Sequence, residues 1–347
     1  MQRTKLLVVD VAALGMNHAR RMNVPGLTFC AAAPCFPALT CVAQAAIRTG
    51  AQPAAHGLVG NGLWFPELKK VLFWEQSASL VEGPRIWDAF RARGKRVGML
   101  FWQQSLGESV DLVLSPRPIH KHEGGMIQDC YSQPVDLYAR LCAKIGRSFN
   151  LMHYWGPLAS RKSSVWITDA TCAVMADPAL APDLLFTYLP HLDYDLQRHG
   201  PDSPQAARAR DVLAALLVKL RAVAEANGYD WLAFGDYAIG GVTAPAIFPN
   251  RALRDAGLFW TRSITGMAYP DFFNSPAFAV VDHEIAHVFA RDHASKEKAR
   301  QMLSALPGVE SVLQGDTRRD AGLEHRRAGD LVLVAKRGTW FAYPWWT

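Results

Sequence analysis

Short apolar runs without alternating polar positions are the most regular feature of this chain. Such runs are typical of strands that are buried on both faces, as in parallel sheets. Three of them are each followed by an acidic residue. The runs are Leu6–Val9, Leu184–Leu189 and Trp231–Phe234, and the acids are Asp10, Asp193 and Asp236. Ligand sites of open α/β sheets gather at the carboxyl ends of strands, so we expect these acids to lie close together.

Helical patterns occupy the stretches between the apolar runs. The predicted helices are Arg85–Arg93, Pro134–Ile145, Ser163–Met175 and Ala207–Asn227. A strand over Val97–Phe101 follows the first of them, as in an αβ unit, and closing strands are predicted at Leu331–Ala335 and Thr339–Tyr343. Strands that alternate with helices predict the α/β class with a mostly parallel sheet.

A further helix begins near Thr40. Pro37 ends an extended approach, Thr40 stands where an N-cap residue belongs, and Cys41–Thr49 is followed by Gly50 at a typical helix end. A hydroxyl in this position has two uses. It caps the helix, or it acts as a nucleophile where free N–H groups and the helix dipole stabilise an anionic phosphoryl group. The residues alone leave both open.

Three carboxylates at strand ends and a hydroxyl at a helix start together predict an oxygen-rich metal site. Carboxylate and hydroxyl donors suit Mg²⁺ or Mn²⁺, whereas imidazole favours zinc. The candidate ligands from this pattern are Asp10, Thr40, Asp193 and Asp236.

Composition narrows the function classes. The chain has 347 residues, of which 50% are hydrophobic and 20% charged, as in a globular protein with a large core. Its net charge of +6 suits an anionic substrate, although it also serves solubility. No block of Lys and Arg indicates binding to a nucleic-acid polymer.

Cysteine usage and hydropathy predict a cytoplasmic protein that does not enter a membrane. The six cysteines form no CxxC pair and have no metal-finger spacing, so we expect reduced thiols. The first apolar run is too short for a signal peptide, and no run reaches the length of a membrane span. The aromatic end at Trp345 and Trp346 predicts a partner surface, for instance in a homodimer, or a continuation of the chain.

The stretch from Phe36 to Asn61 resembles the nucleophile segment of the type I phosphodiesterase/nucleotide pyrophosphatase family of the alkaline phosphatase superfamily. The matching pieces are Pro37-Ala38-Leu39-Thr40, Ala46-Ile47-Arg48-Thr49-Gly50, Pro53-Ala54-Ala55-His56-Gly57 and Asn61. The resemblance implies that Thr40 is the catalytic nucleophile. It also implies that Asn61 reaches the substrate phosphate, where the N–H of Cys41 meets the phosphoryl charge as well.

Two further segments resemble the metal-binding segments of that family but depart from them. Tyr188, Asp193, Gly200 and Pro201 match the second segment, where a ligand histidine is replaced by Gln197. In the third segment Asp236 matches, and Tyr237 stands in place of another ligand histidine. The resemblance therefore implies one hard-cation site or a mismatched pair, with Mg²⁺ or Mn²⁺ favoured over a full zinc pair and zinc as the alternative. Gln197 and Tyr237 join the candidate ligands.

A competing motif lies at Asp282–His287, which contains His283-Glu284-Ile285-Ala286-His287, an HExxH sequence. Two histidines on one helical face with a glutamate between them bind zinc and activate water in metallopeptidases. However, the apolar residues Phe278–Val281 favour a strand that leads into this segment. The alternative is that His287 helps to fill the phosphoesterase metal site.

Together these features predict an alkaline-phosphatase-like α/β fold with a mostly parallel central sheet flanked by helices on both faces. We expect a single domain over residues 1–347, in which 62–160 contributes a partial cap or a substrate-selecting insertion. The predicted function is metal-dependent hydrolysis of a phosphodiester, a pyrophosphate or a related anionic small molecule. The alternatives are a zinc metallopeptidase and a catalytically degenerate binding protein with the same fold.

Overall fold

The chain forms two units, each with its own sheet and core, within the residues 5–346 that the computed structural model describes. The first unit comprises the described residues up to Pro34 together with Gln76–Leu80 and Pro84–Ile239. The second comprises Cys35–Glu75, Val81–Gly83 and the described residues from Gly240 onward. The predicted segment 62–160 is divided between the two units, and its role in selecting a substrate stays a prediction.

A six-stranded sheet organises the first unit. Its strands are β1 (Lys5–Val11), β4 (Val97–Leu100), β5 (Leu112–His120), β6 (Met126–Gln133), β7 (Leu184–Leu189) and β8 (Tyr229–Gly235). Their order is β6-β5-β4-β7-β1-β8, and every neighbouring pair is parallel except β5 with β6. The mostly parallel α/β sheet expected from the apolar runs is therefore confirmed.

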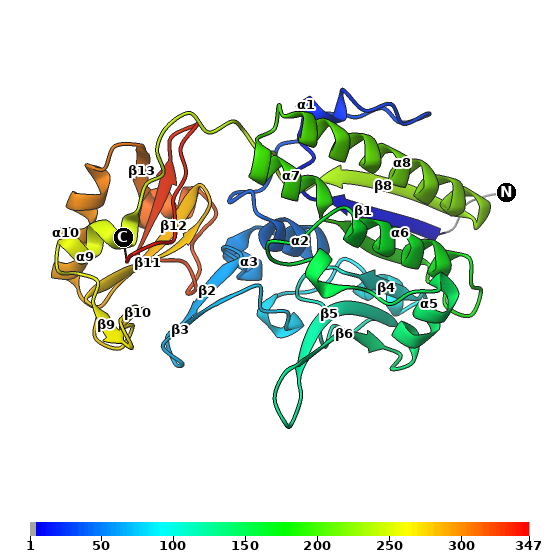
Figure 1. Ribbon diagram of the computed structural model, residues 1–347, viewed down its shortest axis with the longest axis horizontal. Coiled ribbons are helices and arrows are strands. Elements are labelled where there is room, and N and C mark those ends of the chain that lie inside the picture. The colour runs from blue at the N-terminus through cyan, green and yellow to red at the C-terminus, as the bar shows by residue number, and fades with distance from the viewer. Residues whose placement is uncertain (1–4, 347) are drawn as a thin grey trace. The chain divides into compact units, whose positions relative to one another are not determined.

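Helices pack against this sheet, and α6 and α8 run alongside β1 and β8 in Figure 1. The α-helices of the first unit are α1 (Met16–Ala19), α4 (Asp88–Arg91), α5 (Leu137–Ile145), α6 (Lys162–Met175), α7 (His191–His199) and α8 (Pro204–Ala226). Two short 3-10 turns occupy Ala78–Leu80 and Leu151–His153. Within residues 5–346, no helix has the length and the apolar character that crossing a membrane requires.

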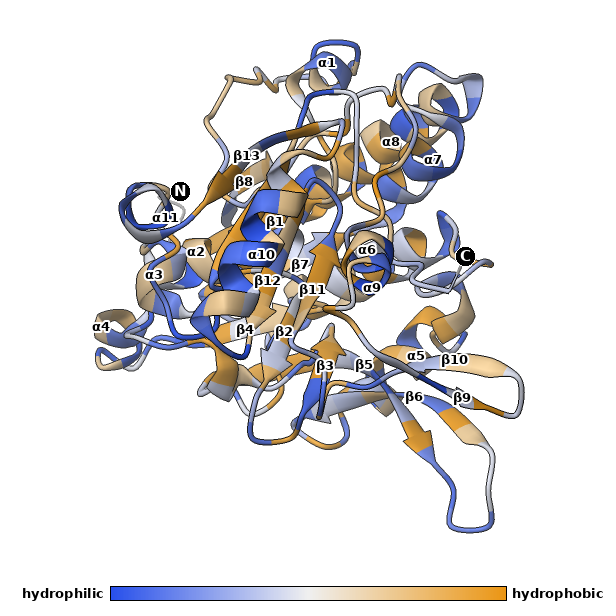
Figure 2. Ribbon diagram, turned by 90° about the vertical axis from the view of Figure 1, so that its left-hand side faces the viewer, coloured by the Kyte–Doolittle hydropathy of each residue, from blue (hydrophilic) through white to orange (hydrophobic). Residues whose placement is uncertain are grey.

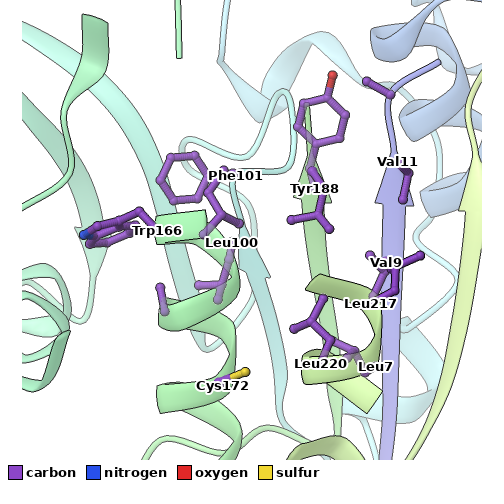
Figure 3. Packing of buried hydrophobic residues seen from close by; sticks show 14 of the residues in the cluster. Leu7, Val9, Val11, Leu100, Phe101, Trp166, Cys172, Tyr188, Leu217 and Leu220 are labelled. Carbon is purple, nitrogen blue, oxygen red and sulfur yellow. The ribbon is translucent and has the colours of Figure 1, made fainter. Parts of the chain in front are cut away.

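The core of the first unit lies between the sheet and two of these helices. Leu7 and Val9 on β1 pack with Leu217 and Leu220 of α8 in a cluster of buried residues (Figure 3). Successive side chains of a strand point to opposite faces. The side chain of Asp10 consequently points away from the face that carries Leu7 and Val9.

The second unit is built on a four-stranded antiparallel sheet in the order β11-β12-β14-β13. These strands are β11 (Ala277–Asp282), β12 (Ile285–Ala290), β13 (Val309–Leu313) and β14 (Leu331–Ala335). Two hairpins accompany the sheet, β2 (Gly62–Phe65) with β3 (Lys70–Phe73) and β9 (Thr261–Ile264) with β10 (Met267–Pro270). The helices are α2 (Thr40–Thr49), α3 (Pro53–His56), α9 (Pro249–Asp255), α10 (His293–Ser304) and α11 (Gly315–Asp320).

Aromatic packing joins the hairpin β2–β3 to this sheet. The ring of Trp64 on β2 meets that of Phe278 on β11 edge-to-face, with 4.7 Å between the ring centroids, and lies 5.5 Å from that of Phe272. Figure 2 shows β11 and β12 as largely hydrophobic, whereas α10 carries many hydrophilic residues. The loop that precedes β2 is therefore fixed next to the end of β11.

Several predicted elements differ in extent from the structure. The pattern over Arg85–Arg93 forms only the single turn α4, and Thr339–Tyr343 forms no strand, since Phe341 makes just an isolated bridge to Ile247. Thr40 is the first helical residue of α2, and Leu39 occupies the N-cap position. The predicted N-cap was thus wrong by one residue.

Candidate active site

Parallel pairing delivers the three predicted acids to neighbouring strand ends in the first unit. Asp10 on β1 is paired with Tyr188 of β7 on one side and with Phe234 of β8 on the other. Asp236 follows directly after β8, and Asp193 lies in the first turn of α7, which begins just after β7. The three acids therefore lie on or just after neighbouring strands, although they are widely separated in the sequence.

Asp236 is held by the backbone around it. This nearly buried carboxylate accepts hydrogen bonds through Oδ1 from the N–H of Ala13, at 3.1 Å, and from the N–H of Tyr237, at 2.9 Å. Backbone donors of this kind fix a carboxylate without adding a charge. The orientation of Asp236 is consequently set by the turn after β8 and by the turn after β1.

Tyr237 and Gln197, which the resemblance predicted to stand in place of ligand histidines, both contact Asp193. The hydroxyl of Tyr237 donates to Oδ1 of Asp193 at 2.7 Å. Nε2 of Gln197 donates to both carboxylate oxygens of Asp193, at 2.9 and 3.0 Å. Asp193 thus accepts hydrogen bonds from neutral donors on two different elements, which lowers the need for a cation at its oxygens.

The pKa of Tyr188 is affected by the charges at this end of the sheet. Burial raises its pKa well above the ordinary value, and the negative charges of Asp236 and Asp10 act in the same direction. Tyr188 therefore stays neutral at physiological pH. The effect of both acids on one phenol agrees with their position on neighbouring strands.

The donor set fits a divalent cation by its chemistry. Carboxylate oxygens are among the donors that Mg²⁺ and Mn²⁺ prefer. Within residues 5–346, however, no three or more His, Cys, Asp or Glu side chains form a group that could hold a metal ion. The candidate ligand set includes Thr40, Gln197 and Tyr237, which are not of those four residue types.

Helix α2 carries Thr40 at its first position in the second unit. Because Leu39 is the N-cap residue and makes no side-chain capping bond, a threonine hydroxyl does not occupy the N-cap position. Gly50 ends the helix in a left-handed conformation, with φ of 65°, which a residue with a side chain rarely adopts. Thr40 is therefore not the N-cap residue of α2, and its role as a nucleophile stays a prediction.

Asn61 contacts the first turn of this helix, and its predicted contact with the substrate phosphate stays a prediction. Its Oδ1 accepts from the N–H of Cys41 at 3.1 Å, across 20 residues of sequence. This N–H therefore already has an acceptor within the chain, and its predicted contact with a phosphoryl group stays a prediction. Asn61 and the first turn of α2 nevertheless form one hydrogen-bonded group.

The other side of Asn61 is bound to Asp282, a residue that the sequence analysis did not connect with the site. Its backbone N–H donates to Oδ2 of Asp282 at 2.6 Å, and its Nδ2 donates to Oδ1 at 3.2 Å. The sequence separation of 221 residues gives no local signal for this pair. Asp282 directly follows the apolar run Phe278–Val281. It therefore fits the same pattern, an apolar run followed by an acid, by which the other three acids were identified.

The HExxH sequence does not form a peptidase site. Asp282 is paired with Ile285, so His283 and Glu284 form the turn of the hairpin β11–β12, and His283 has a positive φ of 59°. Zinc peptidases need both histidines on one helical face. The metallopeptidase alternative is therefore wrong, since its motif lies in a turn and a strand.

His287 is a buried structural residue in this sheet. Its Nε2–H donates to the carbonyl of Val59 at 2.9 Å, and its Nδ1 accepts from the N–H of Gly329 at 3.1 Å. Both ring nitrogens are thus engaged by the backbone, which argues against the predicted contribution of His287 to a metal site. The bond to Val59 holds the same loop that Asp282 holds through Asn61.

Comparison with known proteins places the chain in a family. The model of the family "Type I phosphodiesterase / nucleotide pyrophosphatase" matches residues 16–347. This protein belongs to that family, whose members are phosphoryl hydrolases. The chain has no match among curated proteins.

Solved structures show that the fold is of the alkaline phosphatase type. Phosphonoacetate hydrolase from Sinorhizobium meliloti 1021, in complex with phosphonoformate, is 18% identical with a TM-score of 0.69, and the match covers 99% of this chain and 83% of that one. Murine ectonucleotide pyrophosphatase/phosphodiesterase 5 is 16% identical with a TM-score of 0.66, covering 98% of this chain and 80% of that one. At these identities the likeness concerns the fold alone.

The buried His287 predicts a loss of stability in acid. Burial lowers the pKa of His287 from 6.5 to about 4, although its hydrogen bond to Val59 acts in the opposite direction. Between these two values the unfolded chain binds the proton and the folded chain does not. The contribution is therefore fully present above pH 6.5 and is lost as the pH falls toward 4, by up to about 3 kcal/mol.

Urea unfolding of the unmodified protein and of His287→Gln between pH 4.5 and 8 measures this effect. We expect the variant to show a shallower decline in the free energy of unfolding below pH 6.5, and the same pH dependence as the unmodified protein above pH 7. Equal slopes of the two proteins below pH 6.5 would contradict the assignment of this titration to His287.

Proposed function

We propose that this protein is a metal-dependent phosphoesterase that uses Thr40 as its nucleophile. The observation that carries the proposal is that Asp10 lies near the end of β1, Asp236 follows β8, and Asp193 lies in the first turn of α7 after β7, the three strands being parallel neighbours. Membership of the type I phosphodiesterase/nucleotide pyrophosphatase family supports the same reaction class. The position of Thr40 at the start of α2 supplies the hydroxyl.

The proposed ligands of a first cation are Asp10, Asp236 and Tyr237 of the first unit, together with the hydroxyl of Thr40. A weaker second position is proposed at Asp193 with Gln197. A divalent cation held by such oxygens supplies charge stabilisation to the reacting phosphoryl group. The neutral donors of Gln197 and Tyr237 on Asp193 favour a single Mg²⁺ or Mn²⁺ over a pair of zinc ions.

In the proposed reaction, the hydroxyl oxygen of Thr40 bonds to phosphorus while the bond from phosphorus to the ester oxygen breaks. The proton of the hydroxyl passes through solvent to the ester oxygen, which leaves with the substrate's organic group. The phosphoryl group is then bonded to Thr40, and water hydrolyses that ester to regenerate the hydroxyl. Asn61, fixed beside the helix start by its bond from the Cys41 N–H, is the proposed amide that contacts the phosphoryl oxygens.

The proposed substrates are small anions that carry a phosphodiester, pyrophosphate or phosphonate group. Two of the structurally similar proteins were solved with small phosphorus-containing anions, namely phosphonoacetate hydrolase with the phosphonate phosphonoformate and an inactive form of the murine protein with the phosphomonoester AMP. These ligands belong to proteins of 18% and 16% identity, so they guide only the choice of probes.

Replacement of the nucleophile tests the mechanism. We expect Thr40→Ala to lower the turnover of bis(p-nitrophenyl) phosphate by about 10⁴-fold or more, because no other hydroxyl stands at this helix start. Thr49→Ala is the matched control on the same helix, since the Thr49 hydroxyl donates to the carbonyl of Ala45 at 2.8 Å. Turnover by Thr40→Ala at the rate of the Thr49→Ala control would exclude Thr40 from the reaction.

Metal stoichiometry tests the ligand set. We expect metal analysis of the purified protein to give about one divalent ion per chain, because hard oxygen donors without imidazole favour one Mg²⁺ or Mn²⁺ site. The double variant Gln197→His with Tyr237→His supplies two imidazoles and is expected to bind about two zinc ions. Two stoichiometric zinc ions in the unmodified protein would contradict the proposed set.

A second candidate function is binding of a phosphorylated ligand without turnover. The observation in its favour is that Tyr237 and Gln197 donate hydrogen bonds to Asp193, one of the proposed metal ligands. Calorimetric titration with phosphonoformate and with AMP separates the two. Micromolar binding of either anion, without release of product from any phosphodiester in the presence of Mg²⁺, Mn²⁺ or Zn²⁺, would favour the binding protein.

A further inference from the structure

Asp282 ends β11 in the second unit, beside the turn at His283 that the HExxH sequence forms. Its carboxylate is only 1% exposed, and its two oxygens accept from the backbone N–H and the side-chain amide of Asn61. Burial raises the pKa of the Asp282 carboxyl, while the charge of His283 and these hydrogen bonds act in the opposite direction. Because the buried carboxylate accepts hydrogen bonds from two donors of Asn61, it holds Asn61 firmly.

Asn61 is fixed at each of its polar groups. Besides the two bonds to Asp282, its carbonyl accepts from the N–H of Trp74 at 2.9 Å, and its Oδ1 accepts from the N–H of Cys41. The orientation of the amide follows from this network. If the amide were turned over, its NH₂ would face the N–H of Cys41 and its oxygen would face the carboxylate of Asp282, and both contacts would be repulsive.

We propose that Asp282 is a positioning residue that, through Asn61, fixes the amino-terminal turn of helix α2 on which Thr40 stands. The inference rests on the proposed function, since its catalytic consequence requires Thr40 to be the nucleophile. The chain of contacts runs from the carboxylate of Asp282 to the amide of Asn61 and from there to the N–H of Cys41. A carboxylate accepts from both donors of Asn61 at once, which no neutral side chain of the same shape does.

Asp282→Asn removes the ability to accept from both donors of Asn61, with little change in the volume of the side chain. The substituted amide accepts one of the two hydrogen bonds, but its own NH₂ then faces the other donor of Asn61, so Asn61 must shift or turn. A displacement of about 1 Å near a reacting group costs up to about 10²-fold in rate. We therefore expect Asp282→Asn to lower kcat by about 10- to 100-fold, with a smaller change in KM.

The matched control is Asn250→Ala. Asn250 is a buried residue whose side chain clamps the same strand β11, donating to the carbonyl of Ala279 and accepting from its N–H, both at 2.7 Å. Its loss destabilises the sheet without touching Asn61. We expect a lowered Tm but a kcat within about twofold of the unmodified protein. A kcat loss in Asp282→Asn no greater than in this control would make Asp282 merely structural.

Hydrogen exchange tests the positioning without any need for turnover. The backbone amides of residues 40–44 are followed by mass spectrometry in the full chain, in Asp282→Asn and in Asn250→Ala. We expect faster exchange at the start of α2 in Asp282→Asn than in the control, because the acceptor of the Cys41 N–H is no longer held in place. Unchanged exchange there would overturn the inference, whatever the activity of the protein.

A double-mutant cycle then tests the route of the effect. Because Asp282 acts through Asn61, we expect Asp282→Asn to change kcat by less than about twofold in an Asn61→Ala background. If instead the losses in kcat of the two single variants multiply in the double variant, Asp282 does not act through Asn61. Failure of the phosphoesterase proposal itself appears separately, as absent turnover or as activity retained by Thr40→Ala, while the exchange experiment still decides whether Asp282 fixes the helix start.

Discussion

The parallel pairing of β7, β1 and β8 is the constraint on which the candidate metal site depends. The strands are held in place by the burial of their apolar residues, such as Leu7 and Val9, against the helices that pack on the sheet. The same register sets Asp10 level with Tyr188 and Phe234. A shift of one residue in either ladder would move an acid to the other face of the sheet, so hydrophobic packing determines where the acids lie.

In the second unit, a hairpin positions the residues that hold the loop before β2. The strands β11 and β12 contribute two buried polar residues, Asp282 and His287, which hold the loop before β2 at Asn61 and at Val59. The turn between these strands is short, so both anchors move as one rigid element. The residues that resemble a peptidase motif are thus used to support the loop that contacts helix α2.

Much of this arrangement follows from the sequence because its signals are local. The apolar runs and their terminal acids identify β1, β7 and β8, and Gly50 marks the end of α2. The hydrogen bond of Tyr237 to Asp193 joins residues 44 positions apart, and that of Asn61 to Asp282 joins residues 221 positions apart. No local sequence pattern predicts either contact. The HExxH sequence misled for the opposite reason, since a spacing that marks a helix is meaningless on a strand, where the side-chain period is two.

The two residues predicted to depart from the family pattern, Gln197 and Tyr237, contact the same carboxylate. Gln197 reaches Asp193 from within α7, and Tyr237 reaches it from the turn after β8, so the two side chains converge on the same oxygens. Neutral N–H and O–H donors stabilise a carboxylate that would otherwise need a cation, and they do so without repelling a metal ion nearby. Asp236 is likewise satisfied in part by the backbone N–H groups of Ala13 and Tyr237. Neutral donors of the chain thus stabilise the charged form of two of the three acids without adding a positive charge, which agrees with the proposal of a single hard cation at this end of the sheet.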